Sequence, residues 1–439
     1  MAWTPRTPFY YGWVVLFVGA LGTYVATGAA QITLGGIQSL ITEDTGWDRR
    51  TLAFAVTAGT WAGGSITPFV GRLADKYGPR GLMPVAALVT GICFFALAGS
   101  QSVWQFYAAY IIARAIANPN LVGVVPRTVS VNFFQRRRGL VLGLTSTFRP
   151  ISGAVNIQAI SIIASFYSWR AAYRYLGAFS LVLVIPLFLL MRRRPEDIGL
   201  RPDGDPAPPD SGSTSSSPKI SATTPETPSK EPAWTAREAA RTSAFWLIVF
   251  SEMFTILTSG TISFQVVPYL VDSGLTQPLA VAALSLSSLF GALVNPAWGM
   301  ASDKYSPRKL AMAAIVGTNV IAVFFLVFNG GTAGFVVAIL WGTASGGLNV
   351  LGSMMLAQYF GRASFGAITG LMGPFQIGAL GAGPAFGAIL FNQTGGYTVI
   401  WIYSVAAYAI ALALIFAVRP PERPVKSVEE DRLLGDEAI

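Results

Sequence analysis

Long apolar runs recur along the whole chain and are separated by short polar segments. Twelve of these runs are roughly 20 residues long, enough for an α-helix to cross the ~30 Å hydrocarbon core of a bilayer. The runs cover residues 11–33, 51–71, 82–100, 103–126, 140–165, 172–191, 243–268, 278–300, 310–328, 332–358, 366–391 and 397–418. They lack the polar face of a soluble helix and the alternating pattern of a barrel strand. The pattern predicts an all-α polytopic membrane protein with twelve transmembrane helices.

The composition agrees with a membrane protein and excludes several chemistries. Of 439 residues, 53% are hydrophobic and 12% are charged, against about 25% charged residues in soluble proteins. The single cysteine, Cys93, and the lack of histidine rule out an intrachain disulfide and histidine-based catalysis, metal binding or proton relay. The sequence holds no metal-ligand cluster and no pair of intramembrane carboxylates. We therefore expect a protein that is not an enzyme and that binds no metal or cofactor.

Basic residues gather in alternate loops and so predict the orientation of the spans. Arginine and lysine follow the second, fourth, sixth, eighth and tenth spans, while the opposite loops carry few of them. Because such residues remain on the cytoplasmic side, we expect both termini in the cytoplasm and a multi-pass protein of a bacterial inner membrane. The same bias explains the net charge of +9 without a nucleic-acid partner.

A segment of different character separates the first six spans from the last six. Residues 203–234 read DGDPAPPDSGSTSSSPKISATTPETPSKEPAW, a composition typical of a disordered linker. The predicted organisation is an N-terminal six-helix bundle (1–195), a largely disordered cytoplasmic linker (196–240), a C-terminal six-helix bundle (241–420) and a cytoplasmic tail (421–439).

The two halves of the chain repeat each other. The stretch GRLADKYGPRGL (71–82) returns as GMASDKYSPRKL (299–310), with seven of twelve positions identical. A weaker echo links NFFQRRRGLVLGL (132–144) to QYFGRASFGAITGL (358–371). Spans 2 and 8 therefore correspond, as do spans 5 and 11. Such internal symmetry is typical of transporters that bind substrate between two bundles.

The duplicated Gly-x-x-x-Asp-Lys-x-x-x-Arg motif in a six-plus-six chain resembles the major facilitator superfamily. The resemblance implies two six-helix bundles that rock around a central cavity, and a cytoplasmic gate formed by Asp75, Arg80, Asp303 and Arg308. The alternative role for these charges is to set topology only. Within the superfamily, FFQRRRGLVLGL and RRRPEDIGLRPDG resemble the monocarboxylate-porter and oxalate–formate-antiporter branch. Where that branch carries an arginine before a proline in span 8, this chain has Asn295.

Few charges fall inside the predicted spans. Glu252 is the one acidic residue well inside a span, and Arg114 and Arg149 are the basic ones. Each such charge costs about 2.5–3.5 kcal/mol or more at the centre of a transmembrane helix and therefore needs a reason. Arg149 shares a helical face with Asn156, and the internal repeat places Gln376 at the matching position of the second half. We interpret Arg149 as the counter-ion of an anionic substrate, the alternative being a structural pair with another helix.

The remaining candidates follow from the same spans. Arg114 and Tyr110 share one face of span 4, and either substrate handling or a structural role is open for the arginine. Together with Gln376, Asn295 and Asn156, they complete the predicted substrate-binding set around Arg149. Glu252 is the predicted proton carrier, since burial of a carboxyl favours its protonated form; its alternative is a structural partner of an arginine.

These observations predict a monomeric secondary transporter in the lipid bilayer. Its predicted activity is uptake of a small organic anion, a mono- or dicarboxylate, with proton symport by alternating access. The alternatives are an exporter of drugs or metabolites by proton antiport and an anion exchanger, which needs no proton carrier. A non-transporting sensor would need a large soluble output domain.

Overall fold

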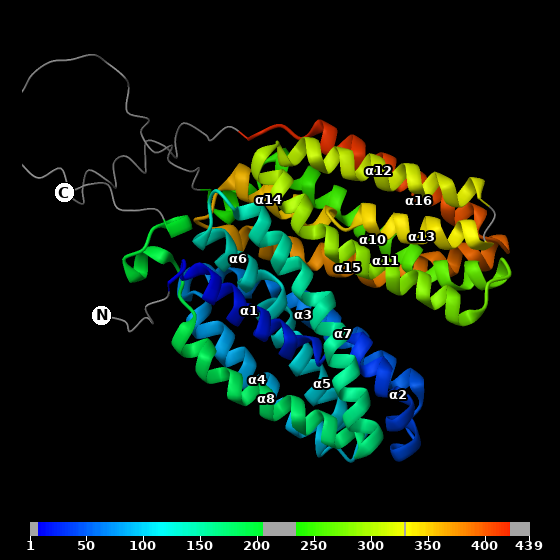
Figure 1. The fold of residues 1–439 in the computed structure, drawn as a ribbon, viewed down its shortest axis with the longest axis horizontal. Coiled ribbons are helices and arrows are strands. Elements are labelled where there is room, and N and C mark those ends of the chain that lie inside the picture. Colours follow the sequence, from blue (N-terminus) through cyan, green and yellow to red (C-terminus); the bar gives the residue numbers. More distant parts are fainter. Residues whose placement is uncertain (1–7, 205–233, 329–330, 422–439) are drawn as a thin grey trace, which may run out of the picture.

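The structure is a computed structural model that describes residues 8–204, 234–328 and 331–421, and helices make up most of these residues (Figure 1). The helices of the first half are α1 Gly12–Thr27, α2 Gln31–Thr45, α3 Arg49–Tyr77, α4 Pro79–Ala98, α5 Val103–Ala117, the π-helical segment Asn118–Val122, α6 Val124–Phe133, α7 Arg138–Phe166 and α8 Trp169–Leu190. Short 3₁₀ segments follow at Pro195–Ile198 and Pro202–Gly204. The second half contains α9 Ala236–Ala239, α10 Ser243–Asp272, α11 Gln277–Lys304, α12 Pro307–Val327, α13 Gly331–Ser345, α14 Leu348–Phe360, α15 Phe365–Thr394 and α16 Thr398–Ala417.

The twelve apolar runs correspond to helical segments of the structure, which confirms the predicted fold class. Nine helical spans within the described residues are long and apolar enough to cross a membrane. The other three expected spans are α1, α3 and α7. The α1 helix is apolar but short, and α3 and α7, which pack against the other half, are not among the nine.

Three predicted spans are not simple rods. The run 11–33 is two helices, because the chain leaves the helical conformation at Ala30 and α2 continues to Thr45. The span predicted at 103–126 runs to Phe133, since the π-helical segment joins α5 to α6 without a loop between them. The run 332–358 is divided into α13 and α14 at the glycine pair Gly346–Gly347. These breaks free backbone groups that side chains elsewhere satisfy.

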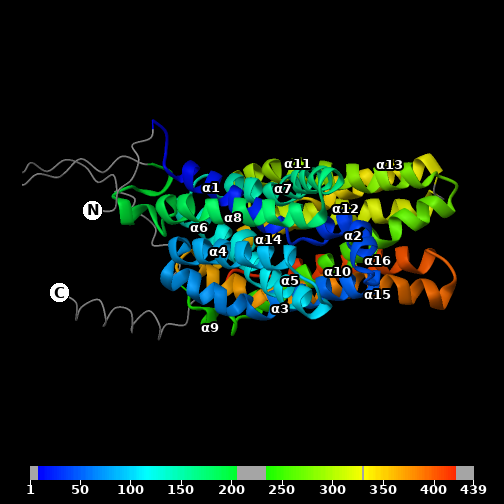
Figure 2. The ribbon, with the colours of Figure 1, turned by 90° about the horizontal axis from the view of Figure 1, so that it is seen from below.

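The helices form two bundles that meet at one end and separate at the other (Figures 1 and 2). Across the interface, α3 packs against α15 and α7 packs against α11. Figure 2 shows α7 lying beside α11. We call the closed end the basic end, since the arginine-rich loops after α3, α6 and α8 lie there, and the opposite end the far end. The two bundles therefore meet at the basic end and diverge toward the far end (Figure 1).

The described flanks of the central segment are ordered against the basic end. Asp203 accepts hydrogen bonds from the backbone N–H groups of Gln135 (2.9 Å) and Arg136 (2.8 Å). Trp234 is buried against Phe360. Residues 205–233 of the predicted linker, and residues 422–439 of the predicted tail, lie outside the described residues.

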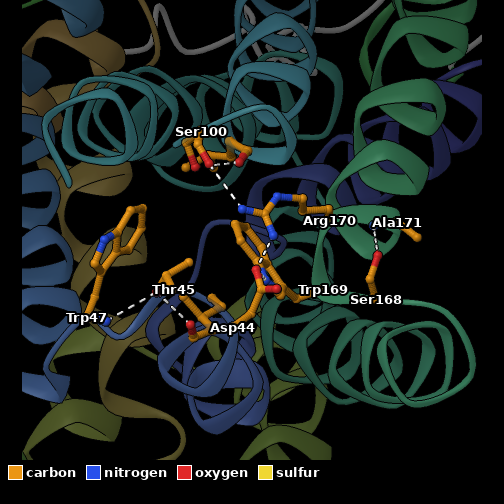
Figure 3. Close-up of polar contacts among 10 residues, drawn as sticks. Asp44, Thr45, Trp47, Ser100, Ser168, Trp169, Arg170 and Ala171 are labelled. Atoms are coloured by element: carbon orange, nitrogen blue, oxygen red, sulfur yellow. Dashed lines mark hydrogen bonds and ion pairs between the residues drawn. The ribbon is translucent and has the colours of Figure 1, made fainter. Parts of the chain in front are cut away.

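At the far end of the first bundle, a polar clamp joins three segments (Figure 3). Asp44, at the end of α2, accepts a hydrogen bond from the indole Nε1 of Trp169 at 3.0 Å and forms an ion pair with Arg170. Arg170 also donates to the carbonyl of Ser100 at 3.3 Å. The Trp169 hydrogen bond, followed by that from Arg170, lowers the pKa of the Asp44 carboxyl. The clamp therefore holds the broken α1–α2 segment against the start of α8.

Candidate functional site

Two aspartates close the basic end in the same way. The Asp75 carboxylate, from α3, accepts backbone hydrogen bonds from Gly366 (3.0 Å) and Ala367 (2.7 Å) in the first turn of α15. The Asp303 carboxylate, from α11, accepts from Gly139 (2.6 Å) and Leu140 in the first turn of α7. A helix N-terminus presents unpaired N–H groups and a positive partial charge, so a carboxylate fits it well. Each bundle therefore holds the other through the same contact, as the internal repeat predicts.

The glycines of the repeated motif allow the helices to approach closely enough for these bonds. A methyl group on Gly71 would overlap the backbone of Gly366, and one on Gly299 would overlap the backbone of Gly139. Any larger residue at these four positions would push α3 from α15, or α11 from α7. The Gly-x-x-x-Asp spacing thus places the small residue and the carboxylate on one helical face, one turn apart.

The arginines of the motif act within their own bundles. Arg80 donates to the carbonyl of Phe188 near the end of α8 at 3.2 Å. Arg308 donates to the carbonyls of Ile415 (3.3 Å) and Phe416 (2.5 Å) near the end of α16. These carbonyls belong to helix C-termini, where a cation is favourable. The four predicted gate residues therefore make two kinds of contact. The aspartates join the two bundles, and each arginine binds the C-terminal end of a helix in its own bundle, α8 or α16.

A third contact across the bundles involves Arg362, which follows α14. It donates to the carbonyl of Asn132 at 3.3 Å and to the carboxylate of Glu196 at 2.9 Å. Deeper in the interface, the Thr147 hydroxyl donates to the carbonyl of Ala292 at 2.9 Å. These bonds, with the aspartate contacts, keep the basic end closed in this conformation.

Arg149 lies on α7, eleven residues after the start of this helix. Its side chain is exposed, and the charges of Arg114 and Arg127 act on it, so it faces the other cationic side chains of the first bundle. Among the described residues it forms no hydrogen bond or ion pair. The helix continues unbroken through Pro150. Arg149 is therefore a cation inside a spanning helix whose guanidinium donors are exposed.

Arg114 has a different environment. It donates to the Thr60 hydroxyl at 2.7 Å and to the carbonyl of Ala29 at 2.6 Å. The buried hydroxyl of Tyr110 donates to the same carbonyl at 2.9 Å. Ala29 lies in the break between α1 and α2, where a carbonyl loses its helical partner. The structure thus places Arg114 and Tyr110 as a cap for the broken end of α1.

A third intramembrane arginine, Arg127, was missed because the fourth span was predicted to end at residue 126. The structure extends this span through α6 to Phe133, which places Arg127 inside it. The side chain is half-buried, and the charge of Glu252 on the opposite bundle acts on it. The arginine-rich loop that begins at residue 135 was the signal that could have revealed it, since a helix running to that loop must contain Arg127.

On the second bundle, the structure brings Glu252 and Gln376 together. The Gln376 amide donates to Oε2 of Glu252 at 2.6 Å, joining α15 to α10. The other carboxylate oxygen lies directly over Gly352 of α14, where a side chain would overlap it. Glu252 therefore sits in a fixed position, half-buried and opposite Arg127.

Two of the other predicted residues lie in packed interfaces. Asn156 is fully buried, and its amide donates to the carbonyl of Tyr24 (2.5 Å) and the hydroxyl of Thr27 (2.7 Å), which ties α7 to α1. Asn295 is buried where α11 crosses α7, with its backbone against Gly143. The polar stripe that Asn156 shares with Arg149 thus faces α1 at the asparagine and the open space only at the arginine.

Comparisons with known proteins agree with this architecture. The sequence profile of the Major Facilitator Superfamily matches residues 13–373 and, in a second match, residues 249–435. The MFS transporter asaE of Aspergillus flavus is 28% identical, over 81% of this chain and 74% of that protein. The hexuronate transporter of Bacillus subtilis is 22% identical, over 82% of this chain and 83% of that protein. The crystal structure of the transporter FucP in the outward conformation shares the fold, with a TM-score of 0.70, 12% identity and coverage of 93% of this chain and 98% of that one.

Proposed function

The chain belongs to the Major Facilitator Superfamily, and from this premise we propose that it takes up a small organic anion, a mono- or dicarboxylate, together with protons. The bundles would alternate between this conformation and one that is closed at the far end and open at the basic end. We further propose that the basic end and both termini face the cytoplasm of a bacterial inner membrane, that the monomer is the working unit, and that the chain belongs to the monocarboxylate-porter and oxalate–formate-antiporter branch.

The observation that carries the proposal is the environment of Arg149. A charge in a spanning helix costs about 2.5–3.5 kcal/mol or more unless something compensates it. Arg149 is exposed and pairs with no described residue. Its guanidinium offers a planar fork of donors that matches a carboxylate. A bound anion would supply the missing counter-charge, and the hexuronate transporter that the chain resembles has, by its name, an acidic sugar as its substrate.

Glu252 supports proton coupling. It is the one acidic side chain well inside a spanning helix of the described chain, and it faces the bundle interface through its electrostatic contact with Arg127. A carboxyl in this position takes up a proton when the interface closes around it and releases the proton when water or Arg127 approaches. An anion exchanger would use Arg149 in the same way without needing Glu252.

The test is binding of a panel of carboxylates to purified parent protein and to Arg149→Lys and Arg149→Gln variants, by calorimetry. Loss of a charge-assisted contact of about 1.5–3 kcal/mol lowers affinity roughly 10- to 100-fold, with the glutamine variant worse than the lysine variant. Neutral analogues should bind parent and variants alike. Arg174→Gln, which removes an exposed arginine from α8, is the matched control and should bind like the parent. Unchanged anion affinity in folded Arg149→Gln protein would leave helix pairing as the role of Arg149.

A further inference from the structure

Arg127 and Arg149 share the wall of the first bundle, and neither is neutralised within that bundle. The charge of Arg127 acts on Arg149, so the two guanidinium groups lie within electrostatic reach of each other. Among the described residues, neither forms a hydrogen bond or an ion pair. The Arg149 side chain is exposed, and the Arg127 side chain is half-buried.

The two arginines lie at a similar depth. The Ser130 hydroxyl of α6 and the Thr145 hydroxyl of α7 form a hydrogen bond of 3.1 Å, which sets these two residues at one level. Arg127 stands three residues before Ser130, and Arg149 stands four residues after Thr145. Because α6 and α7 run in opposite directions, both arginines lie about one helical turn, ~5–6 Å, further from the basic end than this contact. The two cations are therefore neighbours on adjacent helices.

The charge count at this level is unbalanced. The charges of Arg114 and Arg127 act on Arg149, and the charge of Glu252 acts on Arg127, so two positive charges remain among these four side chains. Like charges that approach in a medium of low dielectric constant repel strongly, and this cost remains until counter-charges arrive. Arg114 already has its donors on Thr60 and Ala29, so the open donors are those of the other two arginines.

We infer that Arg127 and Arg149 together bind a dianion whose two acidic groups lie at separate ends, one on each guanidinium. This inference rests on the proposed function and narrows its substrate from a mono- or dicarboxylate to a small dicarboxylate. The acidic group at Arg127 would lie beside Glu252 of the opposite bundle. Two carboxylates in one site favour retention of a proton by one of them, so binding of the dianion at Arg127 favours proton uptake by Glu252. Binding of the second acidic group would thereby link substrate to proton.

The test compares dicarboxylates with their own monoamides, which have the same length and one charge fewer. Malonate, succinate and glutarate and the three monoamides are titrated into the purified full-length parent at neutral pH, by calorimetry. For the dicarboxylate that fits, the parent should bind the diacid at least roughly tenfold more tightly than the monoamide, because a second charge-assisted contact is lost. Equal affinity of the diacid and the monoamide would overturn the inference.

Arg127 variants separate a binding role from a structural one. Arg127→Gln should remove the preference for the diacid while leaving the monoamide affinity close to that of the parent, and Arg127→Lys should keep part of the preference. If Arg127→Gln weakens both ligands equally, Arg127 is structural and the inference fails. Tighter binding of a phosphate monoester such as glycerol phosphate than of any dicarboxylate would place both charges on one group and overturn the two-ended site. Failure of every acid to bind the parent would instead contradict the proposed function itself.

Discussion

Neutralising Asp303 should open the basic end. In the structure its carboxylate accepts two backbone hydrogen bonds, at 2.6 and 3.0 Å, from the first turn of α7 on the other bundle. Asparagine keeps one acceptor oxygen and turns an NH₂ group toward the second N–H. The change removes one charge-assisted hydrogen bond, about 1.5–3 kcal/mol, and the attraction between a negative charge and the helix N-terminus, about 0.3–1 kcal/mol.

The expected loss for Asp303→Asn is therefore about 2–4 kcal/mol of the free energy that favours the closed basic end. Each 1.4 kcal/mol changes an equilibrium tenfold, so the ratio of closed to open molecules should fall roughly 30- to 700-fold. Asp75→Asn breaks the matching contact with α15 and should act similarly. The double variant should be open at the basic end in most molecules. Affinity at Arg149 should change little, since that residue lies ~14–15 Å along α7 from the contact.

The assay is the distance between spin labels in proteoliposomes without substrate. Replacing Cys93 with alanine removes the only cysteine of the chain. Label pairs at the exposed residues Gln135 and Ser306 follow the basic end, and pairs at the exposed residues Ser165 and Asn392 follow the far end. The double variant should lengthen the first distance and shorten the second.

A matched control removes an aspartate at the far end. Asp272 accepts a hydrogen bond from the Tyr397 hydroxyl within one bundle, so Asp272→Asn should leave both distances unchanged. If the double variant at Asp75 and Asp303 gives the distances of the parent, the two aspartates do not hold the bundles together and the reasoning is refuted.

Two further predictions concern other carboxylates. Glu252→Gln should abolish proton-driven accumulation of substrate while sparing exchange of substrate at equal pH on both sides. Gly352→Ala displaces the carboxylate end of Glu252 and should weaken the pH dependence of uptake without lowering the melting temperature. Normal pH profiles of uptake in both variants would make Glu252 structural. The contacts of Asp44 lower the pKa of its carboxyl in the folded protein. Asp44 therefore stabilises the fold at pH values above its unfolded pKa of about 3.9, and this stabilisation disappears as the pH falls through the folded pKa. Asp44→Asn should therefore melt below the parent at pH 7, with the difference closing below about pH 4, and a constant difference across this range would contradict the role of the Trp169 and Arg170 contacts.

The sequence predicted the fold because apolar length alone identifies a spanning helix. It also predicted the correspondence of the two motif copies, and the paired contacts of Asp75 and Asp303 follow this correspondence. Helix ends were less predictable. The apolar run of span 4 ends at Pro126, but α6 continues for a further seven residues to Phe133. Arg127 was therefore not predicted to lie inside a spanning helix.

The candidate site was harder to predict than the fold, because a polar residue on a helix face indicates a neighbour without identifying it. Asn156 and Tyr110 satisfy backbone carbonyls of α1 and of the segment that follows it, in the packed interior of the first bundle. The break at Ala30, which creates part of this demand, has no clear signal in an apolar run. Gln376 was predicted as a partner of substrate, and the structure adds its hydrogen bond to Glu252, a pairing across two helices that sequence spacing does not encode.

The contact at the basic end is reciprocal, and this constrains how such a chain can change over time. Each half supplies one carboxylate and one helix start, and each receives the same pair from the other half. A surface that is complementary to its own copy is what allows two identical subunits to close around a two-fold axis. Two copies of one ancestral half could therefore have closed on each other before they were joined in one chain. Elsewhere the two halves are unequal, with Arg149 in α7 and Gln376 at the matching position of α15, while a substitution in either closing contact weakens the closure that both halves share.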